Sequence, residues 1–453
     1  MPSQPHPADA KTGARAVAWH TLNRVDRDHA FADLVLHAAL RDGDLPRRER
    51  AFATELTYGT LRLRGRIDAV LSQCLERDLS RGQWGIRNLF RLAAYQILFL
   101  PRVRNAAAVS ETIELARAKR LDYAAGFLNA VLRKLVRRAE GPGFTFPDPR
   151  ENPIGHLTDW GSLPAWLAER WVAELGPREA RALAEVCTKA PPRTIRVSAG
   201  VDRETVVRRL RGRPCRFAPR GVTGLRLDPV LDPGFARGEF TVQDEASQLV
   251  PLLLGAEPEE TVVDACAAPG AKAVQLAEQV GPKGEVIALE LHEARLALIH
   301  RAAHRLGLSN LRVLQRDVGK GFDLQGRLRF KRILLDAPCS GLGTLRRNPD
   351  ARWRVRAEDI PVWAERSLRL LSSAARYVER DGVLVYSVCT HTPEETVSLI
   401  TRFLEEQPDF RLDDPRPFLP PAAAELVDAE GALRTWPQRH ACDGFYAVRL
   451  VRS

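Results

Sequence analysis

The stretch TVVDACAAPGAKAVQLAEQV, residues 261–280, decides the fold of the larger part of this chain. It has the pattern of an apolar strand, a Pro-Gly turn and a helix. Further apolar segments alternate with helical stretches behind it: EVIALEL (285–291), LRVLQRD (311–317), RILLDAP (332–338) and GVLVYSVCT (382–390). This alternation predicts βαβ units and a parallel sheet that helices cover on both faces.

The region before this sheet shows a different periodicity. Apolar side chains recur at three- and four-residue spacings from about Lys11 to Arg138, which indicates helices, and Ser110 is the expected N-cap of one of them. The Gly- and Pro-rich stretch 141–153 is typical of a linker. We therefore predict a multidomain chain with an all-α domain (1–140), a linker with a small α+β module (141–235) and a Rossmann-like α/β domain (236–453).

The charge of the chain is unevenly distributed. The formal net charge is +11, and residues 1–140 hold 24 Lys and Arg against 15 Asp and Glu, a difference of +9. Basic side chains beside phosphates release condensed counterions, so the asymmetry favours a polyanionic partner. An Arg-rich overall composition is the alternative explanation for the charge taken alone.

Cysteine usage and hydropathy indicate the compartment. The seven cysteines are scattered and form no CxxC pair, which predicts reduced thiols and no metal site. The N-terminal residues 1–13 are polar, and no apolar run approaches the roughly 18 to 20 residues that a membrane span needs. We expect a cytoplasmic protein with no membrane partner.

Polar groups follow several of the predicted strands. In an open α/β sheet, ligands bind at the carboxyl ends of the strands, so the turn after the first strand is the expected cofactor loop. Glu290 ends the second strand and suits a ribose diol, and Asp317 follows the third and suits an amine or ring edge. A solvated carboxylate or a helix cap explains either acid alone. Suitable groups at three successive strand ends favour a cofactor site.

Two cysteines lie at the ends of the last two predicted strands. Cys339 follows Asp336, and Cys389 closes the segment 382–390. A cysteine in an apolar strand is usually an inert buried residue. Two at adjacent strand ends favour a reactive pair, because a thiolate is a strong nucleophile and cytosine C5 becomes electron-rich only after a nucleophile adds at C6.

Several motifs resemble one family in the correct order over about residues 236–450. They are DACAAPGAK, DAPCSGLG, RRNPDARW, YSVCT followed by EE, and DGFYA. This part of the chain closely resembles the Sun-type family of RNA cytosine-C5 methyltransferases, and residues 11–138 resemble a NusB-type RNA-binding domain. The resemblance implies S-adenosyl-L-methionine (SAM) as the cofactor and a cytosine of 16S ribosomal RNA as the substrate.

The resemblance also implies roles for single residues. Cys389 matches the covalent nucleophile, and Cys339 matches the cysteine that assists breakdown of the intermediate. DNA cytosine methyltransferases use their Pro-Cys cysteine as the nucleophile instead, so the second cysteine separates the two mechanisms. Asp336 matches a residue of the cofactor pocket that also contacts the cytosine edge. The implied SAM pocket consists of Cys266, Ala267, Ala268, Pro269, Gly270, Ala271, Lys272, Glu290, Asp317 and Asp336.

The chain departs from the family pattern at a few positions. Ala271 and Ala273 replace residues of the usual PGGKT loop, Glu290 stands where many relatives have Asp, and Val388 replaces a hydroxyl residue before the nucleophile. None of these changes removes a group that the chemistry requires. They predict a slightly altered cofactor geometry.

The expected RNA partner is 16S ribosomal RNA in an unassembled or partly assembled small subunit, bound by a monomer. Arg346, Arg347 and Asn348 are candidates for contacts with phosphates around the target nucleotide. Two other functions stay open at this stage: a transfer RNA cytosine-C5 methyltransferase, and a non-catalytic RNA-binding factor in ribosome assembly or antitermination. Both thiols argue against the binding factor, which has no use for them.

Overall fold

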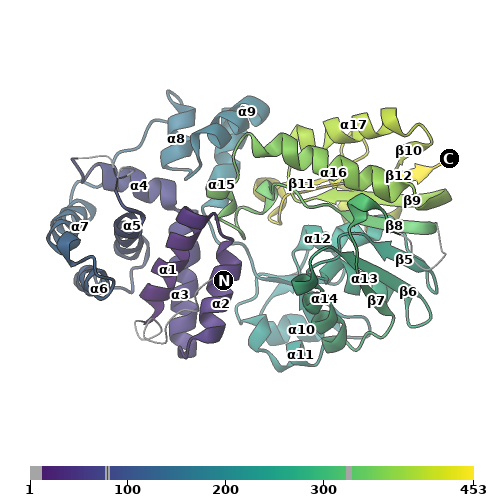
Figure 1. Cartoon of the computed structure of the whole chain (residues 1–453), viewed down its shortest axis with the longest axis horizontal. Helices are drawn as coiled ribbons and strands as arrows, with labels where there is room; N and C mark the ends of the chain where they lie inside the picture. The colour runs from purple at the N-terminus through teal and green to yellow at the C-terminus, as the bar shows by residue number, and fades with distance from the viewer. Residues whose placement is uncertain (1–12, 77–78, 80–81, 323–328) are drawn as a thin grey trace. The chain divides into compact units, whose positions relative to one another are not determined.

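A computed structural model describes residues 13–76, 79, 82–322 and 329–453, so the polar residues 1–12 lie outside the described part. The chain divides into two compact units. One comprises Met1–Ala190 with Leu345–Ala357, and the other comprises Pro191–Thr344 with Glu358–Ser453 (Figure 1). In the described residues, no helix is both long and apolar enough to cross a membrane.

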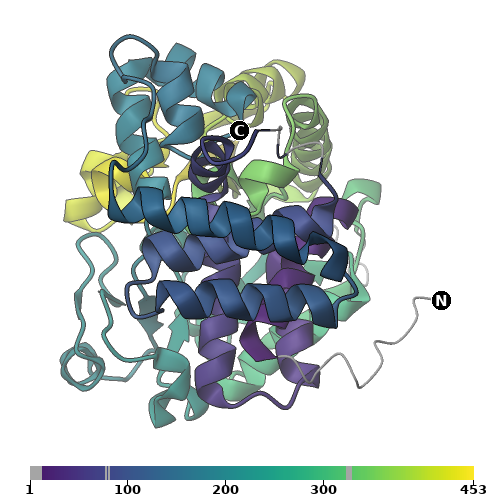
Figure 2. The same ribbon diagram turned by 90° about the vertical axis from the view of Figure 1, so that its left-hand side faces the viewer.

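The first unit is helical, as the periodicity predicts. In α7 the buried residues Leu128, Val131, Leu132 and Leu135 form a stripe at helical spacing. Figure 2 views this unit from the side of α6 and α7, which lie next to each other. Its helices are α1 (Gly13–Asp28), α2 (Ala32–Asp42), α3 (Arg47–Arg62), α4 (Arg64–Ser72), α5 (Trp84–Phe99), α6 (Asn105–Ala118), α7 (Ala125–Glu140), α8 (Pro153–Asp159), α9 (Ala165–Cys187) and α15 (Ala351–Arg354).

Two details of the helical unit differ from the sequence-based expectations. Ser110 lies inside α6 and not at its start, because the Ala-rich turn before it is already helical; its hydroxyl donates to the carbonyl of Ala107. Helices α8 and α9 pack with the helices before them, beyond the Gly- and Pro-rich stretch. One reason is that the Gly65 N–H donates to Ser162 Oγ at 2.9 Å.

A segment from the second half of the sequence, Leu345–Ala357, also belongs to the helical unit. Arg352 in this segment is 0% exposed. Its Nη1 donates to the carbonyls of Arg62 and Ser162, and its Nη2 donates to those of Cys187 and Leu345, at 2.9 to 3.2 Å. The RRNPDARW motif is thus a structural element of the helical unit.

The second unit contains a small antiparallel sheet with the order β2-β3-β1-β4. Val206 and Leu210 of α10 share a core with Ile195 and Phe240 of this sheet, as expected for a small α+β module. The last strand, β4, pairs with β1, although the sequence suggests that the large α/β domain begins before it. The elements are β1 (Thr194–Val197), α10 (Arg203–Leu210), β2 (Arg213–Pro214), β3 (Gly221–Thr223), α11 (Pro233–Ala236) and β4 (Phe240–Val242).

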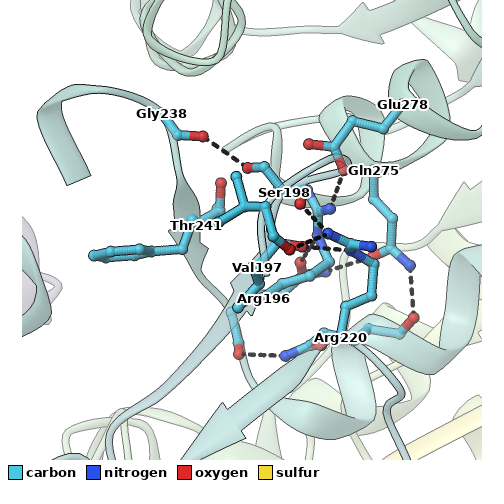
Figure 3. A network of polar contacts seen from close by, with 12 residues as sticks. Arg196, Val197, Ser198, Arg220, Gly238, Thr241, Gln275 and Glu278 are labelled. Atoms are coloured by element: carbon cyan, nitrogen blue, oxygen red, sulfur yellow. Dashed lines mark hydrogen bonds and ion pairs between the residues drawn. The ribbon is translucent and has the colours of Figure 1, made fainter. Parts of the chain in front are cut away.

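A buried polar network joins the small sheet to the helix that follows the predicted cofactor loop (Figure 3). Arg196 of β1 is 2% exposed and pairs with Glu278 of α13. Its Nε also donates to Gln243, whose amide donates to Gln275 of α13 at 3.1 Å. The small sheet is therefore anchored to α13 by charged and amide groups.

The large sheet has the order β10-β12-β9-β8-β5-β6-β7, and β11 pairs with β12. Strands β7, β6, β5, β8 and β9 are parallel, as predicted, whereas β12 is antiparallel to β9 and β10 is antiparallel to β12. The expectation of a purely parallel sheet is wrong at this edge. The strands are β5 (Thr261–Asp264), β6 (Glu285–Glu290), β7 (Leu311–Gln315), β8 (Phe330–Asp336), β9 (Val378–Val388), β10 (Phe410–Asp413), β11 (Leu433–Thr435) and β12 (Phe445–Arg452).

Helices cover both faces of the large sheet (Figure 1). Val262 packs with Leu276 of α13 on one face, and its neighbour Val263 shares a core with Leu371 of α16 on the other. This alternation follows from the two-residue period of a strand. The covering helices are α12 (Glu245–Leu249), α13 (Ala271–Val280), α14 (Glu293–Arg305), α16 (Asp359–Ala375) and α17 (Val397–Glu406), and α18 (Pro437–His440) follows later.

Candidate active site

A cavity of about 530 Å³ opens at the carboxyl edge of the parallel strands. This volume lies within the range of small-molecule sites. Residues from the ends of five adjacent strands, from α14 and from α16 line it: Ala265, Cys266, Ala268, Glu290, Leu291, His292, Arg295, Arg316, Asp317, Val318, Gly319, Lys320, Asp336, Ala337, Pro338, Cys339, Arg366, Arg369, Leu370 and Cys389.

The loop between β5 and α13 has the tight geometry that its Pro-Gly pair predicts. Gly270 precedes α13 with a φ of +108°, in the region that favours glycine. A Cβ atom there would lie 3.1 Å from the Cα of Ile299 in α14. Gly270 therefore lets the cofactor loop lie against α14.

Lys272 and Asp336 form an ion pair in the site. The Lys272 Nζ lies 2.6 Å from Asp336 Oδ2, and the Ser387 hydroxyl donates to Asp336 Oδ1 at 2.6 Å. The Lys272 side chain is 11% exposed and that of Asp336 is 29% exposed. Lys272 does not line the cavity, so it acts on Asp336, the member of the pair that faces the cavity.

Asp264 is an acidic group that sequence reasoning did not single out. Asp264 is the last residue of β5 and is 1% exposed. Its burial, together with the nearby charge of Asp336, raises the pKa of its carboxyl group to about 7. Neither carboxylate oxygen accepts a hydrogen bond of normal geometry from the described residues, although the Cys266 N–H is close enough to lower the pKa. A buried acid short of donors is a common feature of functional sites.

The two acids predicted to bind the cofactor lie on the cavity wall. Glu290, 6% exposed, accepts the His292 N–H at 2.9 Å through Oε1 and lies 3.6 Å from Arg295 through Oε2. Asp317 follows β7 and accepts the Gly319 N–H at 3.0 Å through Oδ1. Both carboxylates retain lone pairs that a ligand can use.

The two cysteines meet at the same edge. Cys339 Sγ lies 3.4 Å from Cys389 Sγ, and both residues line the cavity. The hydrogen bond with Cys389 and burial raise the pKa of the Cys339 thiol well above its usual value. Cys339 therefore keeps its proton at neutral pH and can donate it toward the Cys389 sulfur.

Most of the predicted site residues come together, and a few lie apart from the cavity. The cavity wall includes Cys266, Ala268, Glu290, Asp317, Asp336, Cys339 and Cys389. It does not include Ala267, Pro269 and Gly270 of the loop before α13, or Ala271 and Lys272 of the first turn of α13. Arg346, expected to reach RNA phosphates, is only 8% exposed, and its Nη2 lies 3.5 Å from the carbonyl oxygen of Ala190. Burial in the helical unit makes that expectation wrong for Arg346.

Other residues of the site had no clear signal in the sequence. Arg366 and Arg369 line the cavity from α16, and they look like ordinary charges of an amphipathic helix. Glu395 lies beside the thiol loops, and its only signal is the acidic pair after the second cysteine motif.

Comparisons with known proteins agree with this geometry. Residues 251–451 match the family model described as 16S rRNA methyltransferase RsmB/F, and residues 12–137 match the NusB family. A probable ribosomal RNA small subunit methyltransferase B of Bacillus subtilis (strain 168) is 33% identical over 449 residues, which cover 98% of this chain and 99% of the relative. The chain belongs to the RsmB/F family of 16S rRNA methyltransferases.

Further relatives support membership over the whole length. The ribosomal RNA small subunit methyltransferase B of Thermus thermophilus is 35% identical to this chain, and the matched region covers 97% of each protein. The crystal structure of a protein named PH0851 superposes with a TM-score of 0.78 at 25% identity and covers 99% of both chains. The predicted combination of a NusB-like helical domain and an α/β methyltransferase domain is confirmed, and the chain is a SAM-dependent rRNA methyltransferase with RNA as its substrate.

Proposed function

We propose that this RsmB/F-family enzyme methylates C5 of a cytosine in 16S ribosomal RNA through a covalent bond between Cys389 and C6 of the base. The observation that carries the proposal is the pair of thiols, 3.4 Å apart, in a cavity that Asp336 also lines. A methyltransferase acting on nitrogen or oxygen has no need of such a pair, because its target atom already has a lone pair.

The residues at the cavity suit SAM, which supplies the methyl group when bound. The loop from Cys266 to Lys272 would hold it with Glu290, Asp317 and Asp336. Glu290 retains acceptor capacity for a ribose diol, and the cavity of about 530 Å³ has room for a nucleoside-sized ligand. Asp264 is buried beside the loop and accepts no hydrogen bond of normal geometry within the described part of the chain, so it favours a ligand that brings a hydrogen-bond donor.

The chain's own residues account for the covalent steps. Cys389 loses its proton to solvent and attacks C6 as a thiolate, which places the electron pair of the 5,6 double bond on C5. After C5 has gained the methyl group, its proton leaves to a solvent water molecule. The electrons of that C–H bond restore the double bond and expel Cys389 as a thiolate. We assign Cys339 to this second half, because its sulfur lies beside the bond that breaks.

Asp336 is the residue we place at the cytosine edge. Lys272 and Ser387 hold its two oxygens in a fixed orientation at the end of β8. The Asp336 carboxylate would accept a hydrogen bond from the base and so stabilise the protonated adduct while Cys389 is attached. The ion pair with Lys272 holds the Asp336 carboxylate in this orientation.

The RNA side of the proposal rests on charge and on the requirements of the chemistry. Residues 1–140 carry the excess of +9, which suits contacts with the phosphate backbone. The target base must leave its stack to meet a thiol in a cavity. We therefore propose that a monomer acts on 16S ribosomal RNA before small-subunit assembly buries the site.

The test incubates the full-length protein with labelled SAM and 16S ribosomal RNA that lacks the modification, followed by mapping of 5-methylcytosine. Unmodified transfer RNA and assembled small subunits serve as parallel substrates. We expect one labelled cytosine in the free 16S RNA and little label in the other two. Label on another atom, or preferential label in transfer RNA, would overturn the proposal.

A further inference from the structure

We propose that Glu395 is a positioning residue that holds the loops of Cys339 and Cys389 together, and that release of the methylated RNA depends on it. This inference rests on the proposed covalent mechanism. Glu395 does not line the cavity, so it acts through the residues that it contacts.

The carboxylate of Glu395 binds the residue directly after Cys339 by both backbone and side chain. Oε1 accepts the Ser340 N–H at 2.8 Å, and Oε2 accepts the Ser340 hydroxyl at 2.6 Å. Oε2 also accepts the Thr392 hydroxyl at 2.6 Å. Glu395 is 0% exposed and Ser340 is 3% exposed, so water cannot replace these bonds.

The same network reaches the loop of the second thiol. Ser340 Oγ lies 3.0 Å from Thr390 Oγ1, and Thr390 directly follows Cys389. The backbone carbonyl of Glu395 accepts the Tyr386 hydroxyl at 2.8 Å, which ties the short 3-10 helix Pro393–Glu395 to β9. One buried carboxylate therefore connects the two cysteine loops through Ser340.

A carboxylate is specifically suited to this place because three donors converge on it. A glutamine of the same shape has one oxygen acceptor and presents an N–H₂ group to two hydroxyl groups that now donate. Glu395→Gln would therefore disturb the contacts with Ser340 and Thr392 while keeping the volume of the side chain.

Loss of these contacts should shift Cys339 without unfolding the loop. Gly341, two residues after Cys339, has a φ of +73°, and the Gly343 N–H donates independently to the Cys389 carbonyl at 2.9 Å. The loops thus stay attached farther along the chain. The expected defect is a misplaced Cys339, which affects breakdown of the covalent intermediate more than its formation.

The experiment compares covalent adducts on denaturing gels, using full-length protein, SAM and unmodified 16S ribosomal RNA. The variants are Glu395→Gln, Ser340→Ala and Cys339→Ser. Glu394→Gln is the matched control, since it makes the same chemical change at the half-buried neighbour of Glu395. Single-turnover methyl transfer and steady-state turnover are measured beside the adduct.

We expect Glu395→Gln to accumulate adduct as Cys339→Ser does. Its steady-state turnover should fall at least about tenfold while its single-turnover methyl transfer changes less. Ser340→Ala should show a smaller accumulation, because the Ser340 N–H still reaches Glu395. Glu394→Gln should match the wild type.

Two outcomes separate this inference from the mechanism on which it rests. If Cys339→Ser accumulates no adduct, the proposed covalent mechanism fails, whatever Glu395 does. If Cys339→Ser accumulates adduct and Glu395→Gln loses adduct and methyl transfer in parallel, or behaves as the wild type, the role of Glu395 is contradicted. Should Glu395→Gln not fold, absence of any accumulation in Ser340→Ala contradicts the inference equally.

Discussion

Two regions of this protein bury ionisable side chains, and they differ in how many hydrogen-bond partners the protein itself provides for them. In the helical unit, four backbone carbonyls surround Arg352, and burial lowers its pKa to about 10, so it stays charged. At the carboxyl edge of the large sheet, Asp264 accepts no hydrogen bond of normal geometry from the described residues, and Glu290 and Asp336 retain acceptor capacity toward a cavity. The difference teaches that a buried cation whose two terminal nitrogens are paired with backbone carbonyls holds a fold together, whereas a buried acid short of donors at a strand end indicates a ligand site.

The largest expected effect concerns Arg352, whose two terminal nitrogens donate to four backbone carbonyls. Arg352→Met would leave four buried carbonyls without their donor, so we expect a loss of about 3 to 5 kcal/mol in the free energy of unfolding. Arg352→Lys should lose less, since it keeps the charge but not the fork of donors. Guanidinium unfolding followed by circular dichroism measures both, with Arg41→Met at an exposed ion pair as the control. A loss below about 1 kcal/mol in the free energy of unfolding of Arg352→Met would contradict the stabilising role of Arg352.

The second prediction concerns the ion pair at the site. Asp336→Asn removes the charge that Lys272 compensates and leaves the fold in place, so we expect methyl transfer to fall about 100-fold with little change in stability. Ser387→Ala removes one hydrogen bond to the same carboxylate and should cost about tenfold. Initial rates with labelled SAM measure both variants. Equal rates for Asp336→Asn and the wild type would exclude a role for this carboxylate at the base.

These two regions also differ in how far the sequence could predict them. The strands and the groups at their ends follow from short continuous apolar segments, which alternate with helical stretches, and from the topology of open α/β sheets. The antiparallel pairing of the edge strands β10 and β12 was not predicted. A short buried strand has the same apolar pattern whether it is parallel or antiparallel to its neighbour.

The errors concern charged residues whose partners are distant in the sequence. Arg346 has the same local signature whether it binds phosphate or a buried carbonyl, and the structure places it in the helical unit. Glu395 meets Ser340 across 55 residues, so no local spacing indicates their contact. The roles assigned to Cys389, Cys339 and the SAM-pocket residues stay predictions that the geometry permits.

The third prediction concerns the pH dependence of the free energy of unfolding, which Asp264 should affect. Burial and Asp336 raise the pKa of Asp264 to about 7 from an unfolded value near 3.8. The folded state therefore binds more protons than the unfolded state between these values, and stability falls as the pH rises through this window. We expect the wild type to lose about 2 kcal/mol more than Asp264→Asn between pH 5 and pH 7. Unfolding curves at both pH values test this, and identical pH profiles would contradict it.

The smallest effect is expected at the cofactor wall. Glu290→Gln keeps the shape of the side chain but removes the charge, so the dissociation constant for SAM should rise about tenfold. Calorimetric titration with SAM measures the change. Arg295→Met, which removes the exposed partner of Glu290 at 3.6 Å, should alter binding less. An unchanged constant in Glu290→Gln would remove Glu290 from the proposed pocket.

The measurement that tests the central claim most directly is the trapping of a covalent complex between protein and RNA. Wild type, Cys389→Ser and Cys339→Ser are each incubated with SAM and unmodified 16S ribosomal RNA and separated on a denaturing gel. With Cys389 as the nucleophile, Cys339→Ser accumulates a cross-linked species that carries label, and Cys389→Ser forms none and transfers no methyl group. Accumulation in Cys389→Ser and none in Cys339→Ser would contradict the assignment and make Cys339 the nucleophile.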